Sequence, residues 1–117
     1  METLVIDENF EGLVKNGNNF ELKELIFDGH IKIKLPFGLF VEFSIKSGGS
    51  IESGEWIKSG GSIESGEWIK SGGSIESGRS IESGKWIKSG GSIESGEWIK
   101  SGKWRSEEHT SELQSQR

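Results

Sequence analysis

The chain of 117 residues is 31% hydrophobic, contains 18 glycines and carries a net charge of −5. Because glycine adds no side chain to a core and under a third of the residues are hydrophobic, a large two-layer core would be hard to build from this composition. It leaves a disordered chain or a fold that needs one large apolar residue per short repeat. The absence of cysteine excludes disulfides and thiol chemistry, and the absence of a basic patch argues against a nucleic-acid partner.

The first 26 residues predict a β-structured N-terminal cap, because a solenoid needs a different terminal unit to cover its open end. The segments TLVID (3–7) and NFELKELIF (19–27) are short strand-like runs, and Asn16-Gly17 between them favours a tight turn. All the phenylalanines lie in the first 44 residues and suit a bulky cap, with a ligand pocket as the alternative. They are Phe10, Phe20, Phe27, Phe37, Phe40 and Phe43.

The N-terminus is acidic and lacks the basic segment and long apolar run of a signal peptide. The cytoplasm is therefore the default expectation for location. No run approaches 18 apolar residues, so no membrane span is expected.

Residues 27–104 predict a repeat of six residues, with degenerate units over 27–44 and regular units over 45–104. The regular unit is Ile-[Lys/Glu]-Ser-Gly-x-[Ser/Trp], and the same phase continues backwards through Leu39, Ile33 and Phe27. Isoleucine recurs at every sixth residue without interruption and forms the expected core ladder. Its members are Ile45, Ile51, Ile57, Ile63, Ile69, Ile75, Ile81, Ile87, Ile93 and Ile99.

A period of six excludes an amphipathic helix, which needs apolar residues every three or four positions. In a strand, Ile and the Ser two residues later point to one side and the intervening Lys or Glu to the other. The Gly that follows can take positive φ and turn the chain. Stacked coils of this kind form an all-β parallel β-solenoid with Ile and Ser inside; the disordered chain is the competing interpretation.

The charges indicate how many units make one coil. With three units per coil, four of seven neighbouring contacts join opposite charges; with two, six of eight contacts join like charges. Because neighbouring like charges destabilise a sheet, three sides with 18 residues per coil are favoured over two sides with 12. The four favourable contacts are Lys46–Glu64, Glu82–Lys100, Glu52–Lys70 and Lys58–Glu76.

The repeat resembles the hexapeptide-repeat family of parallel β-helices and, more loosely, the β-helical bacterial cytoskeletal polymers called bactofilins. The resemblance covers residues 45–104 and extends weakly to 27–44. Typical hexapeptide β-helices place the small inward residue two positions before the aliphatic one, whereas here it follows the isoleucine. The acyltransferase activity common in that family is therefore not expected here, and the resemblance leaves the handedness open.

Residues 105–117 lack the six-residue phase, so a disordered tail is expected. The segment RSEEHTSELQS (105–115) resembles, residue for residue, the in-frame translation of a common short-read sequencing adapter. The resemblance implies that the tail is not biological and that the natural protein continues beyond Trp104 with further repeats and a C-terminal cap. His109 in this tail is therefore given no expected function.

No pattern typical of an enzyme active site or a cofactor site occurs, so neither catalysis nor a cofactor is expected. His30, the one histidine outside the tail, has no acid–base partner in the sequence and is expected to be structural. The outward glutamates could form a carboxylate row, but Ca²⁺ needs about six to eight oxygens and half of this row is lysine. No metal site is therefore expected at Glu52, Glu64, Glu76, Glu82 or Glu94.

Tryptophan occupies the position just before isoleucine and is expected to point outward, forming an apolar stripe that serves as an interaction surface. The five are Trp56, Trp68, Trp86, Trp98 and Trp104. A three-sided coil aligns Trp68, Trp86 and Trp104, so ladders that only cover the coils are the other interpretation of these residues.

The sequence therefore predicts a non-enzymatic structural repeat protein, either a rigid scaffold or a subunit that associates with itself end to end or laterally. The alternative is a surface module that binds carbohydrate through its outward Trp and Ser rows.

Overall fold

A computed structural model describes residues 2–17, 19–102 and 104–107. Within these ranges the chain forms strands and no helix, and the strands lie in three sheets. Sheet A holds β1 (Thr3–Ile6), β5 (His30–Ile33), β8 (Ile51–Ser53), β11 (Ile69–Ser71), β14 (Trp86–Ser89) and β17 (Trp104–Glu107). Sheet B holds β2 (Val14–Asn16), β3 (Asn19–Leu22), β6 (Leu39–Val41), β9 (Ile57–Ser59), β12 (Ile75–Ser77) and β15 (Ile93–Ser95). Sheet C holds β4 (Leu25–Phe27), β7 (Ile45–Ser47), β10 (Ile63–Ser65), β13 (Ile81–Ser83) and β16 (Ile99–Ser101).

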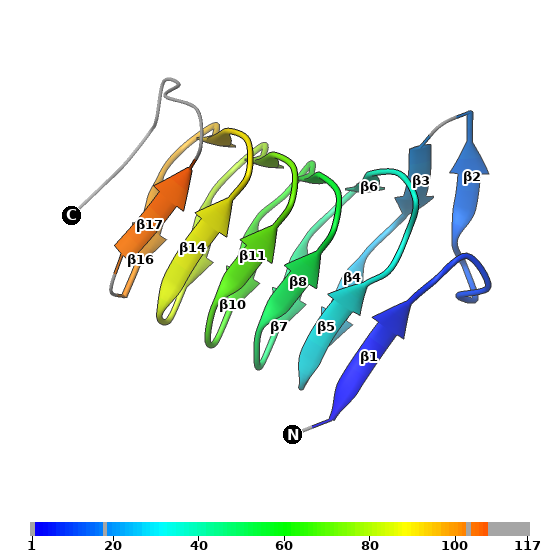
Figure 1. Cartoon of the computed structure of the whole chain (residues 1–117), viewed down its shortest axis with the longest axis horizontal. Coiled ribbons are helices and arrows are strands. Elements are labelled where there is room, and N and C mark those ends of the chain that lie inside the picture. Colours follow the sequence, from blue (N-terminus) through cyan, green and yellow to red (C-terminus); the bar gives the residue numbers. More distant parts are fainter. Residues whose placement is uncertain (1, 18, 103, 108–117) are drawn as a thin grey trace.

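The chain visits sheets C, A and B in turn, so three hexapeptide units make one coil. Ile45 pairs with Ile63, Ile51 with Ile69 and Ile57 with Ile75, all in parallel register. Figure 1 shows the coils as successive turns, with β5, β8, β11 and β14 side by side. The predicted three-sided parallel β-solenoid with 18 residues per coil is therefore confirmed, and the two-sided alternative is wrong.

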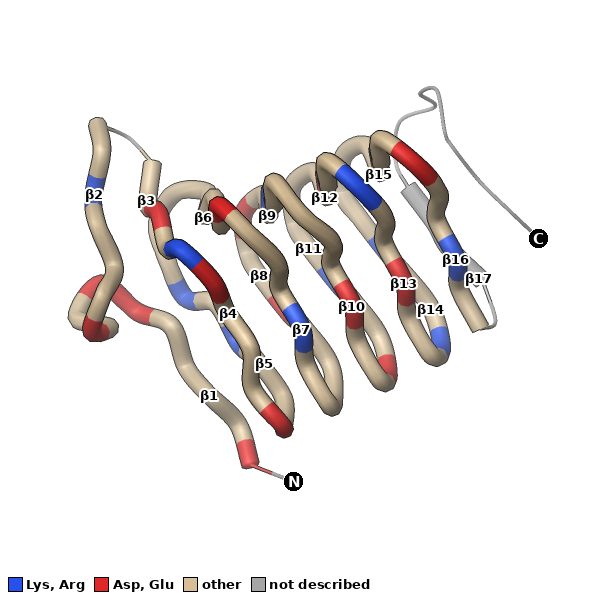
Figure 2. Tube along the Cα trace, turned by 180° about the vertical axis from the view of Figure 1, so that it is seen from behind, with Lys and Arg blue, Asp and Glu red and all other residues tan. Residues whose placement is uncertain are grey.

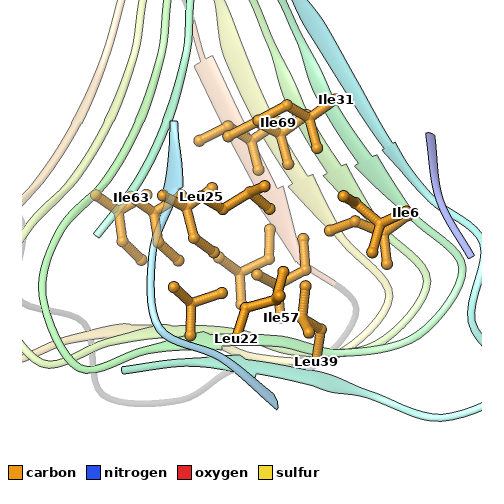
Figure 3. Packing of buried hydrophobic residues seen from close by; sticks show 14 of the residues in the cluster. Ile6, Leu22, Leu25, Ile31, Leu39, Ile57, Ile63 and Ile69 are labelled. Carbon is orange, nitrogen blue, oxygen red and sulfur yellow. The ribbon is translucent and has the colours of Figure 1, made fainter. Parts of the chain in front are cut away.

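Isoleucine from all three sheets fills the interior. All ten isoleucines of the regular repeat are 0% exposed and belong to one hydrophobic cluster. Figure 3 shows Ile57, Ile63 and Ile69, one from each sheet, converging on the same interior space. One branched side chain per hexapeptide thus supplies the core that the overall composition could not build as two layers.

The serine two positions after each isoleucine links successive coils. In a typical unit the Ser65 hydroxyl donates to the carbonyl of Gly49 in the previous coil at 2.5 Å, and Ser65 Oγ accepts from the Glu67 amide at 3.2 Å. Ser77 and Ser89 repeat this geometry. Every buried side-chain nitrogen or oxygen among the described residues has a hydrogen-bond partner, so the inward serines satisfy the corner backbone at no cost in unpaired groups.

Close approach requires the glycine that follows each repeat serine, except at Gly54, and none of these glycines has the positive φ that glycine permits. The positive φ values among the described glycines are 92° at Gly12 and 66° at Gly17, both before the repeat. At Gly66, instead, an added Cβ would lie 2.4 Å from the carbonyl oxygen of Gly48 in the previous coil. The corners stack so closely that a side chain has no room, whatever the backbone angles.

The N-terminal segment extends the solenoid's own sheets. β1 pairs in parallel with β5 and β3 pairs in parallel with β6, while β2 and β3 form an antiparallel hairpin at Asn16-Gly17. Phe20 is 2% exposed and stacks on Phe37, with ring centroids 6.1 Å apart. Phe37 and Phe43 are themselves exposed at 38% and 52%.

The expected phase of Phe27 and Ile33 is wrong by two residues. Leu25, not Phe27, pairs with Ile45, and Ile31, not Ile33, pairs with Ile51; Leu39 keeps the expected pairing with Ile57. The cause is the corner at residues 34–38 between β5 and β6, which has five residues where the regular corner at 54–56 has three.

The predicted tail begins within a strand. Residues 105–107 continue β17, whose backbone pairs in register with Trp86–Ser89 of β14. Residues 108–117 lie outside the described part of the chain, so the disorder and non-biological origin expected for them stay predictions.

Candidate functional site

The outward surface of each sheet carries one row of charges, because the middle residue of each short strand points away from the core. Figure 2 shows the sheet C row as blue, red, red and blue at β7, β10, β13 and β16. These residues are Lys46, Glu64, Glu82 and Lys100. Sheet A carries Lys32, Glu52, Lys70 and Lys88, and sheet B carries Lys58, Glu76 and Glu94.

The four opposite-charge contacts expected from an 18-residue coil all lie in register. In one of them the Lys58 Nζ lies 3.9 Å from Glu76 Oε1, with side chains 53% and 40% exposed. Exposed pairs of this kind contribute about 0–1 kcal/mol each. The charged rows therefore contribute little to the stability of the fold.

A groove runs along the outside of each sheet, beside its charged row. The sheet C groove is lined by Lys46, Glu64, Glu82 and Lys100 together with the serines and glycines of the adjoining corners. The grooves of sheets B and A have the same construction. Serines and glycines at the strand ends line each groove together with the charged side chains.

The tryptophans do not form the expected single stripe, because in an 18-residue coil their spacing distributes them over three corners. Trp68 and Trp86 lie at the corner between sheets C and A and stack with ring centroids 5.1 Å apart and planes 4° apart. Trp56 lies between sheets A and B, and Trp98 between sheets B and C. Trp104 begins β17, and its backbone pairs with that of Trp86.

The tryptophans whose side chains are described are half-buried because they pack on the coil before them. A Cβ added to Gly38 would lie 1.8 Å from Trp56 Cε2. Ser50 and Ser80, whose neighbours in the next coil are Trp68 and Trp98, are each only 5% exposed. Trp68 and Trp86 cover each other's facing rings, which favours inter-coil packing over a platform for sugar rings.

His30 has a structural environment, as its sequence context predicts. Its Nδ1 accepts a hydrogen bond from the Ser50 amide at 2.9 Å and lies 2.9 Å from Ser50 Oγ. It therefore joins the corner column that continues through Ser50, Trp68 and Trp86, with Thr3 of β1 on its other side.

One further pair was not expected from the sequence. Arg79 lies in the unit that breaks the alternation of the repeat, and its Nε is 3.7 Å from Glu97 Oε2 in the next coil. Its column holds Gly61 one coil earlier, as the backbone bond from the Arg79 amide to the Gly61 carbonyl shows. The 18-residue spacing of Arg79 and Glu97 was the signal that could have revealed the pair.

Among the described residues, no group of three or more His, Cys, Asp or Glu is arranged to hold a metal ion. Nor does that part of the chain contain a helix long and apolar enough to cross a membrane.

No protein-family model matches the chain, and searches of the curated proteins and of the solved structures give no match either. The likeness to hexapeptide-repeat proteins and bactofilins therefore rests on the repeat and the parallel solenoid alone. What the molecule does has to be argued from how its coils are built.

Proposed function

We propose that this protein is a non-enzymatic structural repeat protein, a rigid scaffold whose copies assemble into filaments. One observation carries the proposal: every invariant residue of the repeat serves to stack one coil on the next. Isoleucine fills the core, serine bonds to the corner of the previous coil, and glycine allows the corners to touch.

The remaining positions of the repeat form flat charged faces and packed corners. An active site would need side chains of several kinds converging on one point, with a nucleophile or acid–base pair in reach of a substrate. Here the outward residues recur in rows, and His30 is engaged with Ser50. A uniform stack of coils is the product of such a sequence, which suits a rod or filament.

The edge strand β4 supports end-to-end assembly. Sheets A and B begin with β1 and β2, whereas sheet C begins with β4, which pairs with β7 on one side and with no other described strand. The Leu25 amide and the Phe27 carbonyl bond toward the neighbouring coil. By alternation, the backbone groups of Ile26 face away from β7, where they can pair with a strand of another copy.

We expect negative-stain electron microscopy of the full chain to show unbranched filaments whose length grows with protein concentration. Ile26→Pro removes the outward amide and should shorten or abolish the filaments, because proline cannot donate to a sheet ladder. Ile26→Val keeps the amide and is the matched control. Circular dichroism should show that both variants are folded. Discrete particles of the unmodified chain at every concentration would contradict self-assembly and leave a monomeric spacer.

A further inference from the structure

The outer faces of sheets A and B carry opposite charges, coil by coil. Along sheet A the row runs Glu52, Lys70, Lys88. Along sheet B, one unit further on, it runs Lys58, Glu76, Glu94. From Glu52 and Lys58 onward, each charge in one row thus has its opposite at the same level in the other row, although the two faces of one molecule point in different directions; Lys32, one coil earlier on sheet A, is level with Phe40 on sheet B.

The same two coils hold like charges side by side within each face. Lys70 neighbours Lys88 on sheet A, and Glu76 neighbours Glu94 on sheet B. The strand beyond Lys88 places Ser106 next to it, and β15, which carries Glu94, is the last described strand of sheet B. Among the described residues, Lys88 and Glu94 therefore lack an oppositely charged neighbour in their own sheets, and like neighbours are destabilising.

We infer that face A of one molecule binds face B of a second copy, with the two solenoid axes parallel and the coils level. Glu52 then meets Lys58 of the second copy, Lys70 meets its Glu76, and Lys88 meets its Glu94. This inference rests on the proposed scaffold function and identifies its lateral contact. Because the two surfaces differ, each bound copy still offers one face of each kind, and the contact repeats into rings or bundles.

Sheet C fits this role less well. Glu64 and Glu82 are neighbours on its face, but each also has a lysine beside it in the sheet, Lys46 and Lys100, so its charges are already balanced. A contact between faces B and C would place Glu76 level with Glu82 of the second copy. Charge therefore disfavours a contact between faces B and C.

A contact between faces C and A also joins opposite charges, but its corner is bulkier. The corner shared by C and A carries the stacked pair Trp68 and Trp86. The corner shared by A and B is Gly-Gly-Ser at residues 72–74 and 90–92, in the coils of Lys70 and Lys88. In the coils of Lys70 and Lys88, two copies can therefore approach along the A–B edge without a large side chain between the faces; one coil earlier, at the level of Glu52, Trp56 occupies this corner.

The expected binding is weak and strongly dependent on salt. Complementary rows set the register and the rate of encounter more than the affinity, and exposed charges are screened once their separation exceeds the Debye length. We therefore expect sedimentation velocity of the full chain to show association at an ionic strength of about 0.01 M that is lost at about 1 M.

Charge reversal tests the inference. Reversing face A (Glu52→Lys, Lys70→Glu, Lys88→Glu) or face B (Lys58→Glu, Glu76→Lys, Glu94→Lys) should weaken lateral association at least about tenfold, which corresponds to about 1.4 kcal/mol. An equimolar mixture of the two variants should restore it, because each then meets a complementary face. Reversing face C (Lys46→Glu, Glu64→Lys, Glu82→Lys) is the matched control and should change nothing.

Each alternative outcome is decisive. Association that survives reversal of faces A and B, or that is lost on reversal of face C, would overturn the inference, as would a wild-type chain that shows no lateral association at low salt. Electron micrographs separate this result from a failure of the scaffold proposal. The reversed variants should keep the length of their filaments and lose only the side-by-side bundling.

Discussion

Replacing Ile75 by alanine is expected to lower the free energy of unfolding by about 2–5 kcal/mol. Ile75 is 0% exposed and lies between Ile57 and Ile93 in the sheet B column. In a solenoid each coil contacts only its neighbours, so a cavity in one coil weakens the interfaces on both sides of it. Because the regular coils contain few other apolar residues, no second hydrophobic layer can compensate for this cavity.

The measurement is urea unfolding followed by circular dichroism, with Ile26→Ala as the matched control. Ile26 is 59% exposed on the outer side of β4, so its truncation should change stability by no more than about 0.5 kcal/mol. Equal effects of the two substitutions would show that the isoleucine column is not the core.

Replacing Gly72 by alanine is expected to destabilise the protein, whereas the same change at Gly54 is expected to be neutral or stabilising. A Cβ at Gly72 would lie 2.3 Å from the carbonyl oxygen of Gly54, but a Cβ at Gly54 meets no atom within 4 Å. Forcing an atom into a closed space costs about 1–3 kcal/mol or more. Where space is free, Gly→Ala stabilises by about 0.4–1 kcal/mol through the unfolded chain.

The two glycines hold the same position in successive coils, so the pair isolates close approach from every other property of glycine. The melting temperature should fall for Gly72→Ala and stay the same or rise for Gly54→Ala, by about 4–8 °C for each kcal/mol in a domain of this size. If Gly54→Ala lowers the melting temperature as much as Gly72→Ala does, the requirement is conformational, and the stacking explanation fails.

The repeat was sufficient to predict the coil. An invariant isoleucine every six residues gave the inward ladder, and the charges gave 18 residues per turn, because only that spacing places Lys46 beside Glu64 and Lys58 beside Glu76. Because these features are periodic, every copy of the hexapeptide gives evidence about the same local geometry.

What the sequence did not predict depends on single, non-periodic events or on contacts between coils. The two extra residues in the corner at 34–38 moved Phe27 and Ile33 out of the expected phase. The reason for the glycines was misassigned, since a carbonyl from the previous coil is invisible in one hexapeptide. The five tryptophans were expected to form one surface, although the 18-residue spacing that aligns Trp68 with Trp86 already places Trp56 and Trp98 at other corners.

The candidate surface was predicted in part. The outward position of the Lys and Glu rows follows from strand alternation alone. The complementarity of faces A and B was not predicted, although the 18-residue columns already assign Glu52, Lys70 and Lys88 to one face and Lys58, Glu76 and Glu94 to the next; it emerges only when the rows of two copies are compared.

The most direct test of the three-sided coil is the distance between outward positions 18 and 12 residues apart. The chain has no cysteine, so pyrene can be attached at Glu64→Cys with Glu82→Cys, or at Glu64→Cys with Glu76→Cys. Glu64 pairs with Glu82 in sheet C, about 4.8 Å away across neighbouring strands, whereas Glu76 lies on sheet B. With labelled protein diluted in unlabelled chain, we expect excimer emission from the first pair and none from the second; excimer emission from the second pair alone, or from neither, would contradict the 18-residue coil.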